Sequence, residues 1–225
     1  MSTRSLATLA VGLLLLAAGC SGGTTPASGT GESSPDLPSM PGEAPPRFTK
    51  FADFPGGELL FTQPGAPLGV RLKPIDTSWT GELATKPAAA GKHFLAVYVA
   101  VTGELPDRGV DNVELRGLTV RYKPTAGECK STSYGDGYCY AEAAIASGLD
   151  EVADGTWHEY PWSDQPYVGT KLARGATIIG VAGFPVPDTI EAAGGFDLCA
   201  PSKKEGYSPS RFPGTPVKTP EQPRS

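Results

Sequence analysis

The stretch KHFLAVYVAVT, residues 92–102, decides the fold class. Its alternate positions form two apolar sets: one holds Leu95, Val97, Val99 and Val101, and the other holds Phe94, Ala96, Tyr98 and Ala100. Successive side chains of a β-strand point to opposite faces of its sheet, so two apolar sets indicate a strand that is covered on both faces. We therefore expect residues 92–102 to form a central strand.

Shorter alternating segments flank this strand on both sides, separated by turns that contain Gly and Pro. They cover residues 59–61, 68–73, 113–115, 118–122, 176–184 and 196–200. Gly117, between two of them, is typical of a β-bulge. Residues 140–146 have the pattern of a turn or two of helix. Six or seven short strands without helical periodicity predict an all-β fold, an antiparallel β-sandwich.

The segments outside these strands differ in composition. Residues 21–47 are mostly Gly, Pro, Ser and Thr, and residues 203–225 are rich in proline. Such segments bury too little apolar surface to offset the entropy cost of ordering. We therefore expect a disordered tether over residues 20–47, a β-sandwich domain over residues 48–202 and a disordered tail over residues 203–225.

The overall composition excludes two classes of protein. The chain has 225 residues, of which 29 are Gly and 23 are Pro, and its formal net charge is −5. Gly and Pro together reach about twice their usual share, which argues against a bundle of long helices. The negative charge argues against a basic nucleic-acid-binding protein, so no nucleic-acid partner is expected.

The first twenty residues have the layout of a secretory signal peptide. Arg4 precedes an apolar run from Leu6 to Ala18, which is shorter than the ~20 residues that cross a bilayer as a helix. The run ends in LAAGC, residues 16–20, which resembles the lipobox of bacterial lipoproteins with its leucine one position early. The resemblance implies removal of residues 1–19, a diacylglycerol group on Cys20, and anchoring in the membrane as a lipoprotein. The alternative is an ordinary secreted protein that is cleaved near Ala18.

The central strand also carries a family resemblance. Residues 91–101 are similar to the G-x-x-F-x-x-V-x-V-x-V strand in the immunoglobulin-like extracellular domains of bacterial lipoproteins, the DUF4352 type. Residues 113–123 and 172–188 fit later parts of the same pattern. The resemblance implies an immunoglobulin-like β-sandwich over roughly residues 55–200, placed at the cell surface, and it implies no catalytic residues. The chain departs from the family at GELP, residues 103–106, where Asn is usual, and in a long insert over residues 125–170.

Catalytic and metal-binding patterns point to no enzyme. His158 and Glu159 begin the H-E-x-x-H motif of zinc proteases, but Trp162 stands where the second His is needed. The sequence contains neither the G-x-S-x-G nor the S-x-x-K pattern of a serine nucleophile. The acidic loops near Asp107 and Asp150 lack the spacing of a calcium loop. We therefore predict no catalysis, no cofactor and no metal site.

The cysteines predict one disulfide. Once Cys20 is acylated, Cys129, Cys139 and Cys199 remain, an odd number in a compartment that permits disulfides. Residues 135–137 (Gly-Asp-Gly) would turn the chain back between Cys129 and Cys139, so we predict that these two pair and that Cys199 is a free thiol. The alternative links Cys199 to Cys129 or Cys139.

The insert supplies a candidate binding patch of aromatic residues with polar tips. Its members are Tyr134, Tyr138, Tyr140, Trp157, Tyr160 and Trp162. Such side chains suit the recognition of a ligand or a protein, and they also suit a cap that closes one end of a sandwich. We favour the structural role for Trp157 and Trp162, and we expect Tyr134 and Tyr138 at exposed loop tips.

These observations together predict a membrane-anchored extracytoplasmic lipoprotein. It would present a β-sandwich binding or interaction module without catalysis, on the outer face of the bacterial cytoplasmic membrane or at the cell surface. Its partners would be the membrane, through the lipid on Cys20, and an unidentified envelope protein or ligand. The alternative is a carrier of a lipid or another apolar ligand, which requires an apolar cavity.

Overall fold

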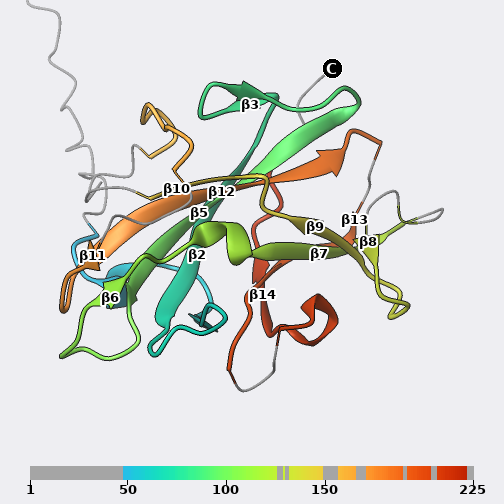
Figure 1. Cartoon of the computed structure of the whole chain (residues 1–225). Helices are drawn as coiled ribbons and strands as arrows, with labels where there is room; N and C mark the ends of the chain where they lie inside the picture. Colours follow the sequence, from blue (N-terminus) through green and yellow to red (C-terminus); the bar gives the residue numbers. More distant parts are fainter. Residues whose placement is uncertain are drawn as a thin grey trace, which may run out of the picture. The chain divides into compact units, whose positions relative to one another are not determined.

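A computed structural model describes residues 48–125, 129, 132–148, 157–165, 171–189, 192–203 and 207–221. The predicted signal peptide, the predicted acylation site Cys20 and the predicted tether lie outside the described residues. Within them the chain forms β-strands and three short 3-10 turns, and no α-helix. Two five-stranded antiparallel sheets pack face to face around a shared core (Figure 1). The predicted all-β antiparallel sandwich is confirmed.

The first sheet is built around the strand that the sequence places at its centre. Its order is β1 (Leu59–Phe61), β2 (Val70–Thr80), β5 (Lys92–Gly103), β12 (Thr177–Pro187) and β10 (Ile145–Gly148). Strand β5 pairs along nearly its whole length with β2 on one side and β12 on the other. Pro185 and Pro187 of β12 lie beyond Gly183, where the pairing with β10 ends. That side of the strand is open there, so a residue without an N–H is tolerated.

The second sheet includes strands that the sequence did not predict. Its order is β14 (Gly214–Val217), β13 (Ala192–Cys199), β7 (Thr119–Pro124), β9 (Cys139–Glu142) and β8 (Thr132–Ser133). The expected disorder of residues 203–225 is wrong for β14, which pairs with residues 196–199 of β13. The buried side chains of Phe212 and Val217 supply the apolar contacts that order this segment.

Short elements complete the fold. They are η1 (Phe51–Asp53), the hairpin of β3 (Glu82–Leu83) and β4 (Lys86–Pro87), β6 (Val110–Asp111) paired with β11 (Lys171–Leu172), η2 (Leu115–Gly117) and η3 (Pro209–Arg211).

The predicted insert contributes three strands to the sandwich. Residues 125–170 contribute β8 and β9 to the second sheet and β10 to the first. The helical pattern over residues 140–146 is therefore wrong, because these residues end β9 and begin β10. The strand expected over residues 113–115 is wrong as well. Leu115 begins the 3-10 turn η2 and is buried there, and Gly117 ends that turn instead of forming a bulge.

Strand β5 is buried on both faces, as predicted. One set of its side chains, which includes Val97 and Val99, packs against the second sheet and forms the main core with residues such as Val120 and Leu198. The other set, which includes Tyr98, belongs to a second hydrophobic cluster on the outer face of the first sheet. The first sheet is thus covered by a further layer of chain, and this layer forms the site described below.

Candidate binding cleft on the outer face of the first sheet

The six aromatic residues of the predicted patch fall into two groups. Tyr134, Tyr138 and Tyr140 lie at the disulfide and β9, whereas Trp157, Tyr160 and Trp162 lie in the segment 157–165, which we call the cap segment. Trp157 and Trp162 are buried in the outer cluster, as expected of residues with a structural role. Tyr140 is buried too, and Tyr138, expected at an exposed loop tip, is half-buried. The two exposed members, Tyr134 and Tyr160, lie in different groups.

The first group is held by the disulfide and by contacts with Arg121, Lys123 and Asp136. Cys129 and Cys139 form the predicted disulfide, with Cα atoms 5.4 Å apart. The ring of Tyr138 lies 5.2 Å from the guanidinium carbon of Arg121 and 4.8 Å from Nζ of Lys123, which is cation–π geometry. Burial and a hydrogen bond donated to Asp136 raise the pKa of Tyr140. The hydroxyl group of Tyr140 and the ring face of Tyr138 are therefore engaged by neighbours.

Cys199 is a free thiol, as predicted, and its side chain is buried. Burial raises the pKa of the Cys199 thiol to about 12. A thiol of this kind is almost wholly protonated at neutral pH and is a poor nucleophile. Its position therefore indicates packing and not chemistry.

Tyr160 and Trp162 of the second group line one wall of a cleft. The cleft has a volume of about 450 Å³ and lies between the cap segment and the β3–β4 hairpin. Its lining comes from three regions: the end of β2 with the hairpin, the middle of β5, and the cap segment. The lining residues are Ser78, Trp79, Thr80, Glu82, Leu83, Ala84, Thr85, Tyr98, His158, Tyr160, Pro161 and Trp162. Glu82, Thr85 and Tyr160 are exposed at the rim, so the cleft opens to solvent.

Two polar pairs lie at the cleft. The Ser78 and Tyr98 hydroxyl oxygens are 3.3 Å apart, and the Nε2 atom of His158 donates to the Asp76 carboxylate over 2.8 Å. Burial raises the pKa of the Tyr98 hydroxyl, so this group stays protonated at neutral pH and can donate a hydrogen bond. The Tyr98 and His158 rings meet edge to face, with centroids 4.5 Å apart. These contacts fix the orientation of the imidazole at the cleft.

The hairpin wall carries backbone strain. Ala84 and Thr85 form its two-residue turn with φ angles of +51° and +62°. Residues other than Gly, Asn and Asp rarely adopt this left-handed region, which costs about 1–2 kcal/mol per residue. Such strain tends to persist where function requires a particular backbone, so it favours a functional role for the hairpin wall.

The Leu83 side chain of the same hairpin packs closely against the backbone of the first sheet at Gly183. A Cβ atom at Gly183 of β12 would lie 2.6 Å from Cδ2 of Leu83. Only glycine leaves room for Leu83 to pack here, and this contact brings the hairpin down onto β12 beside β5.

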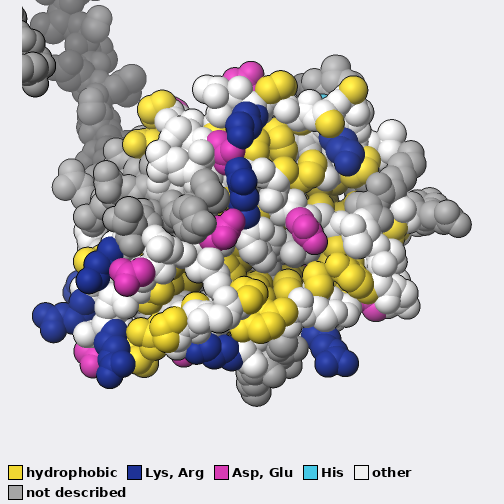
Figure 2. Space-filling model, in the orientation of Figure 1, with side chains coloured by type: hydrophobic (Ala, Val, Ile, Leu, Met, Phe, Trp, Pro, Cys, Tyr) yellow, Lys and Arg dark blue, Asp and Glu magenta, His cyan; other side chains and the backbone are white. Residues whose placement is uncertain are grey.

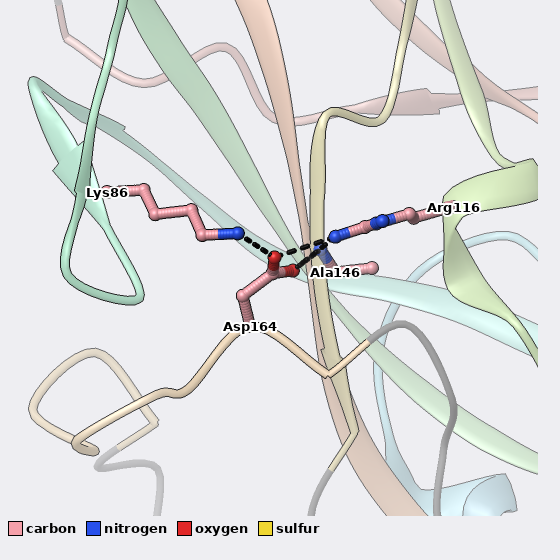
Figure 3. A network of polar contacts seen from close by, with 4 residues as sticks. All are labelled: Lys86, Arg116, Ala146 and Asp164. Carbon is pink, nitrogen blue, oxygen red and sulfur yellow. Dashed lines mark hydrogen bonds and ion pairs between the residues drawn. The ribbon is translucent and has the colours of Figure 1, made fainter.

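One carboxylate ties the cap segment to three other elements (Figure 3). Asp164 points between the hairpin and η2, and it accepts hydrogen bonds from Lys86, from Nη2 of Arg116 at 2.7 and 2.9 Å, and from the Ala146 amide of β10 at 3.4 Å. Burial acts to raise the pKa of Asp164, but these hydrogen bonds and the positive charges outweigh it and lower the pKa. We call these four residues the Asp164 clamp.

In Figure 2, acidic, basic and hydrophobic side chains are interspersed on the face that the view shows. Among the described residues, no group of three or more His, Cys, Asp or Glu is placed to hold a metal ion. No helix in the described part of the chain is long and apolar enough to cross a membrane.

No protein-family model, curated protein or solved structure matches the chain.

Sequence reasoning missed most of the cleft. Of its lining residues it proposed only Tyr160 and Trp162 for a patch, and it considered His158 only as part of a failed zinc motif. His158 and Asp76 are 82 positions apart, and Arg116 and Asp164 are 48 apart. No local pattern of charge or hydropathy signals such pairs.

Proposed function

We propose that this chain is a membrane-anchored extracytoplasmic lipoprotein of the immunoglobulin-like DUF4352 type, and that its β-sandwich is a binding module without catalysis. The observation that carries the binding part is the cleft between the cap segment and the β3–β4 hairpin. Its volume falls within the ~300–1,000 Å³ that is usual for small-molecule sites. The anchoring part rests on the lipobox that ends at Cys20.

The construction of the cleft supports a binding role. The core between the two sheets is filled without any residue of the hairpin or of the cap segment. The strained turn at Ala84 and Thr85 and the Asp164 clamp nevertheless hold these two walls in fixed positions. Fixed walls lower the ordering cost that a ligand would otherwise meet on binding.

A lipid carrier has less support. Such a carrier needs an enclosed apolar cavity, and the space between the sheets is packed with side chains such as Leu95, Val97 and Leu198. The cleft on the outer face opens to solvent and is lined by polar as well as apolar residues. An acyl chain placed there would leave buried polar groups without partners.

The binding proposal is tested by crosslinking in living cells. A photo-crosslinking amino acid replaces Thr85 at the rim of the cleft in the full-length chain, and the matched control replaces Tyr134 at the disulfide loop. We expect an adduct, identified by mass spectrometry, from position 85 that is missing from position 134. Identical results at both positions would refute the cleft as the binding site.

The anchoring proposal is tested by membrane fractionation. The Cys20→Ala chain should be found in the soluble fraction or the medium, because it has no acyl chains. If the Cys20→Ala chain still sediments with membranes, the anchor is not the lipid on Cys20.

A further inference from the structure

The aromatic surface that the cleft offers to a ligand comes mainly from one ring. Tyr160 is 38% exposed, whereas Tyr98 and Trp162 beside it are buried. The Tyr160 ring meets Trp162 edge to face, with centroids 5.2 Å apart, and this contact fixes its orientation. Trp79, which also belongs to the lining, is half-buried and its ring packs edge to face on Phe196, so the exposed platform is the Tyr160 ring. A quaternary ammonium ligand is instead held by a cage of several aromatic faces.

Polar groups that can bond a hydroxylated ligand surround this platform. Thr85 contributes a hydroxyl group that can donate and accept, and Ser78 contributes a second one that it shares with Tyr98, whereas the Thr80 hydroxyl donates to the Glu82 carbonyl. Glu82 contributes an exposed carboxylate, and His158 contributes an imidazole oriented by Asp76. A ligand that carries several hydroxyl groups could satisfy these atoms from more than one side.

The charge of the lining limits the ligand further. Glu82 is the one carboxylate among the described residues that line the cleft, and this lining contains no Lys or Arg. Lys86 lies next to the lining, but it donates to Asp164 in the clamp. A phosphate or a polyanion would therefore meet Glu82 without a lining cation to offset it, whereas an uncharged ligand meets no such repulsion.

We propose that the cleft binds an uncharged pyranose unit of a glycan. The C–H face of the sugar lies on the Tyr160 ring, whose π-face is negative, and the sugar hydroxyl groups bond to Glu82 and His158. This inference rests on the proposed function of the cleft as a ligand site. It adds the chemical class of that ligand.

Binding of neutral tetrasaccharides by the full-length chain tests this inference. The chain is purified in a detergent that has no sugar headgroup and is titrated with maltotetraose, cellotetraose, mannotetraose and N-acetylchitotetraose, followed by calorimetry and tryptophan fluorescence. We expect at least one of them to bind. Tyr160→Ala should raise its Kd about tenfold or more, equivalent to about 1.4 kcal/mol, and Tyr160→Phe should keep it within about twofold.

Controls separate the failure of this inference from failure of the proposed function. Tyr134→Ala removes a similarly exposed tyrosine (42%) outside the cleft and should leave the Kd unchanged. Choline and a proline-rich peptide are titrated as comparators. If one of these binds in a Tyr160-dependent way and no glycan does, the glycan assignment is overturned while the cleft remains a binding site. Failure of all four glycans to bind, or glycan binding that Tyr160→Ala does not weaken, overturns the inference as well.

Discussion

Replacement of Asp164 by Asn should release the cap segment from the sandwich. The side chain of Asp164 is only 9% exposed, and it accepts hydrogen bonds from two cations and one backbone amide. Arg116 and Lys86 are partly exposed, so each ion pair contributes much less than a buried pair would. Together with the two hydrogen bonds from Arg116 and the desolvation of the carboxylate, these ion pairs contribute about 2–3 kcal/mol to the free energy of unfolding. For a domain of this size, that corresponds to a fall in Tm of about 5–10 °C.

Calorimetry and hydrogen exchange measure the two consequences of this change. Tm reports the loss of overall stability, and amide exchange over residues 157–165 reports whether the cap segment opens locally before the sandwich unfolds. Glu159→Gln is the matched control, because Glu159 is an exposed carboxylate on the same segment. If Asp164→Asn and Glu159→Gln give the same Tm and the same exchange, the clamp does not hold the segment.

The lowered pKa of Asp164 adds a pH dependence to this prediction. A carboxylate whose pKa is lower in the folded state contributes stability at pH values above its unfolded pKa. This contribution is lost as the pH falls through the folded pKa. The advantage in Tm of the wild type over Asp164→Asn should therefore be constant near neutral pH and should shrink below about pH 4, where the ordinary carboxyl begins to protonate.

Three further changes test other parts of the structure. Deletion of residues 212–225 should lower Tm strongly by calorimetry, since the burial of Phe212 and Val217 is worth about 1.5–3 kcal/mol each; an unchanged Tm would show that β14 adds nothing. Cys129→Ser together with Cys139→Ser should cost up to about 3 kcal/mol in denaturant unfolding, yet crosslinking from position 85 in the cleft should persist. Thr85→Gly should raise Tm by relieving the left-handed turn, and a lower Tm would show that this backbone is not strained.

The parts of the fold that the sequence predicted are those with a local cause. The two apolar sets of residues 92–102 predicted a central strand that is covered on both faces, and β5 has both features. The loop between Cys129 and Cys139 predicted their pairing because the chain has to turn back within ten residues. In both cases the information lies within about a dozen neighbouring positions.

The errors have a common cause as well. Prolines at positions 213, 216 and 220 made residues 203–225 resemble a disordered tail. An edge strand tolerates proline, however, and β14 is the edge strand of its sheet. The indole of Trp79 also donates to the Pro220 carbonyl over 3.2 Å, a contact between residues 141 positions apart. The composition of residues 203–225 is typical of a disordered tail, but composition carries no information about the distant residues that order part of this segment.

The cap segment combines the two roles that the sequence left as alternatives for its aromatic residues. Trp157 and Trp162 face the sheet, and the indole of Trp162 donates to the Trp157 carbonyl over 2.8 Å, which closes the turn between them. That turn leaves His158 and Tyr160 facing solvent at the cleft. Since the buried pair positions the exposed pair, a substitution at Trp162 should affect stability and ligand binding together, whereas Tyr160→Ala should affect binding alone. If Tyr160→Ala destabilised the domain as much as Trp162→Ala does, the exposed ring would be part of the cap and not a surface for a ligand.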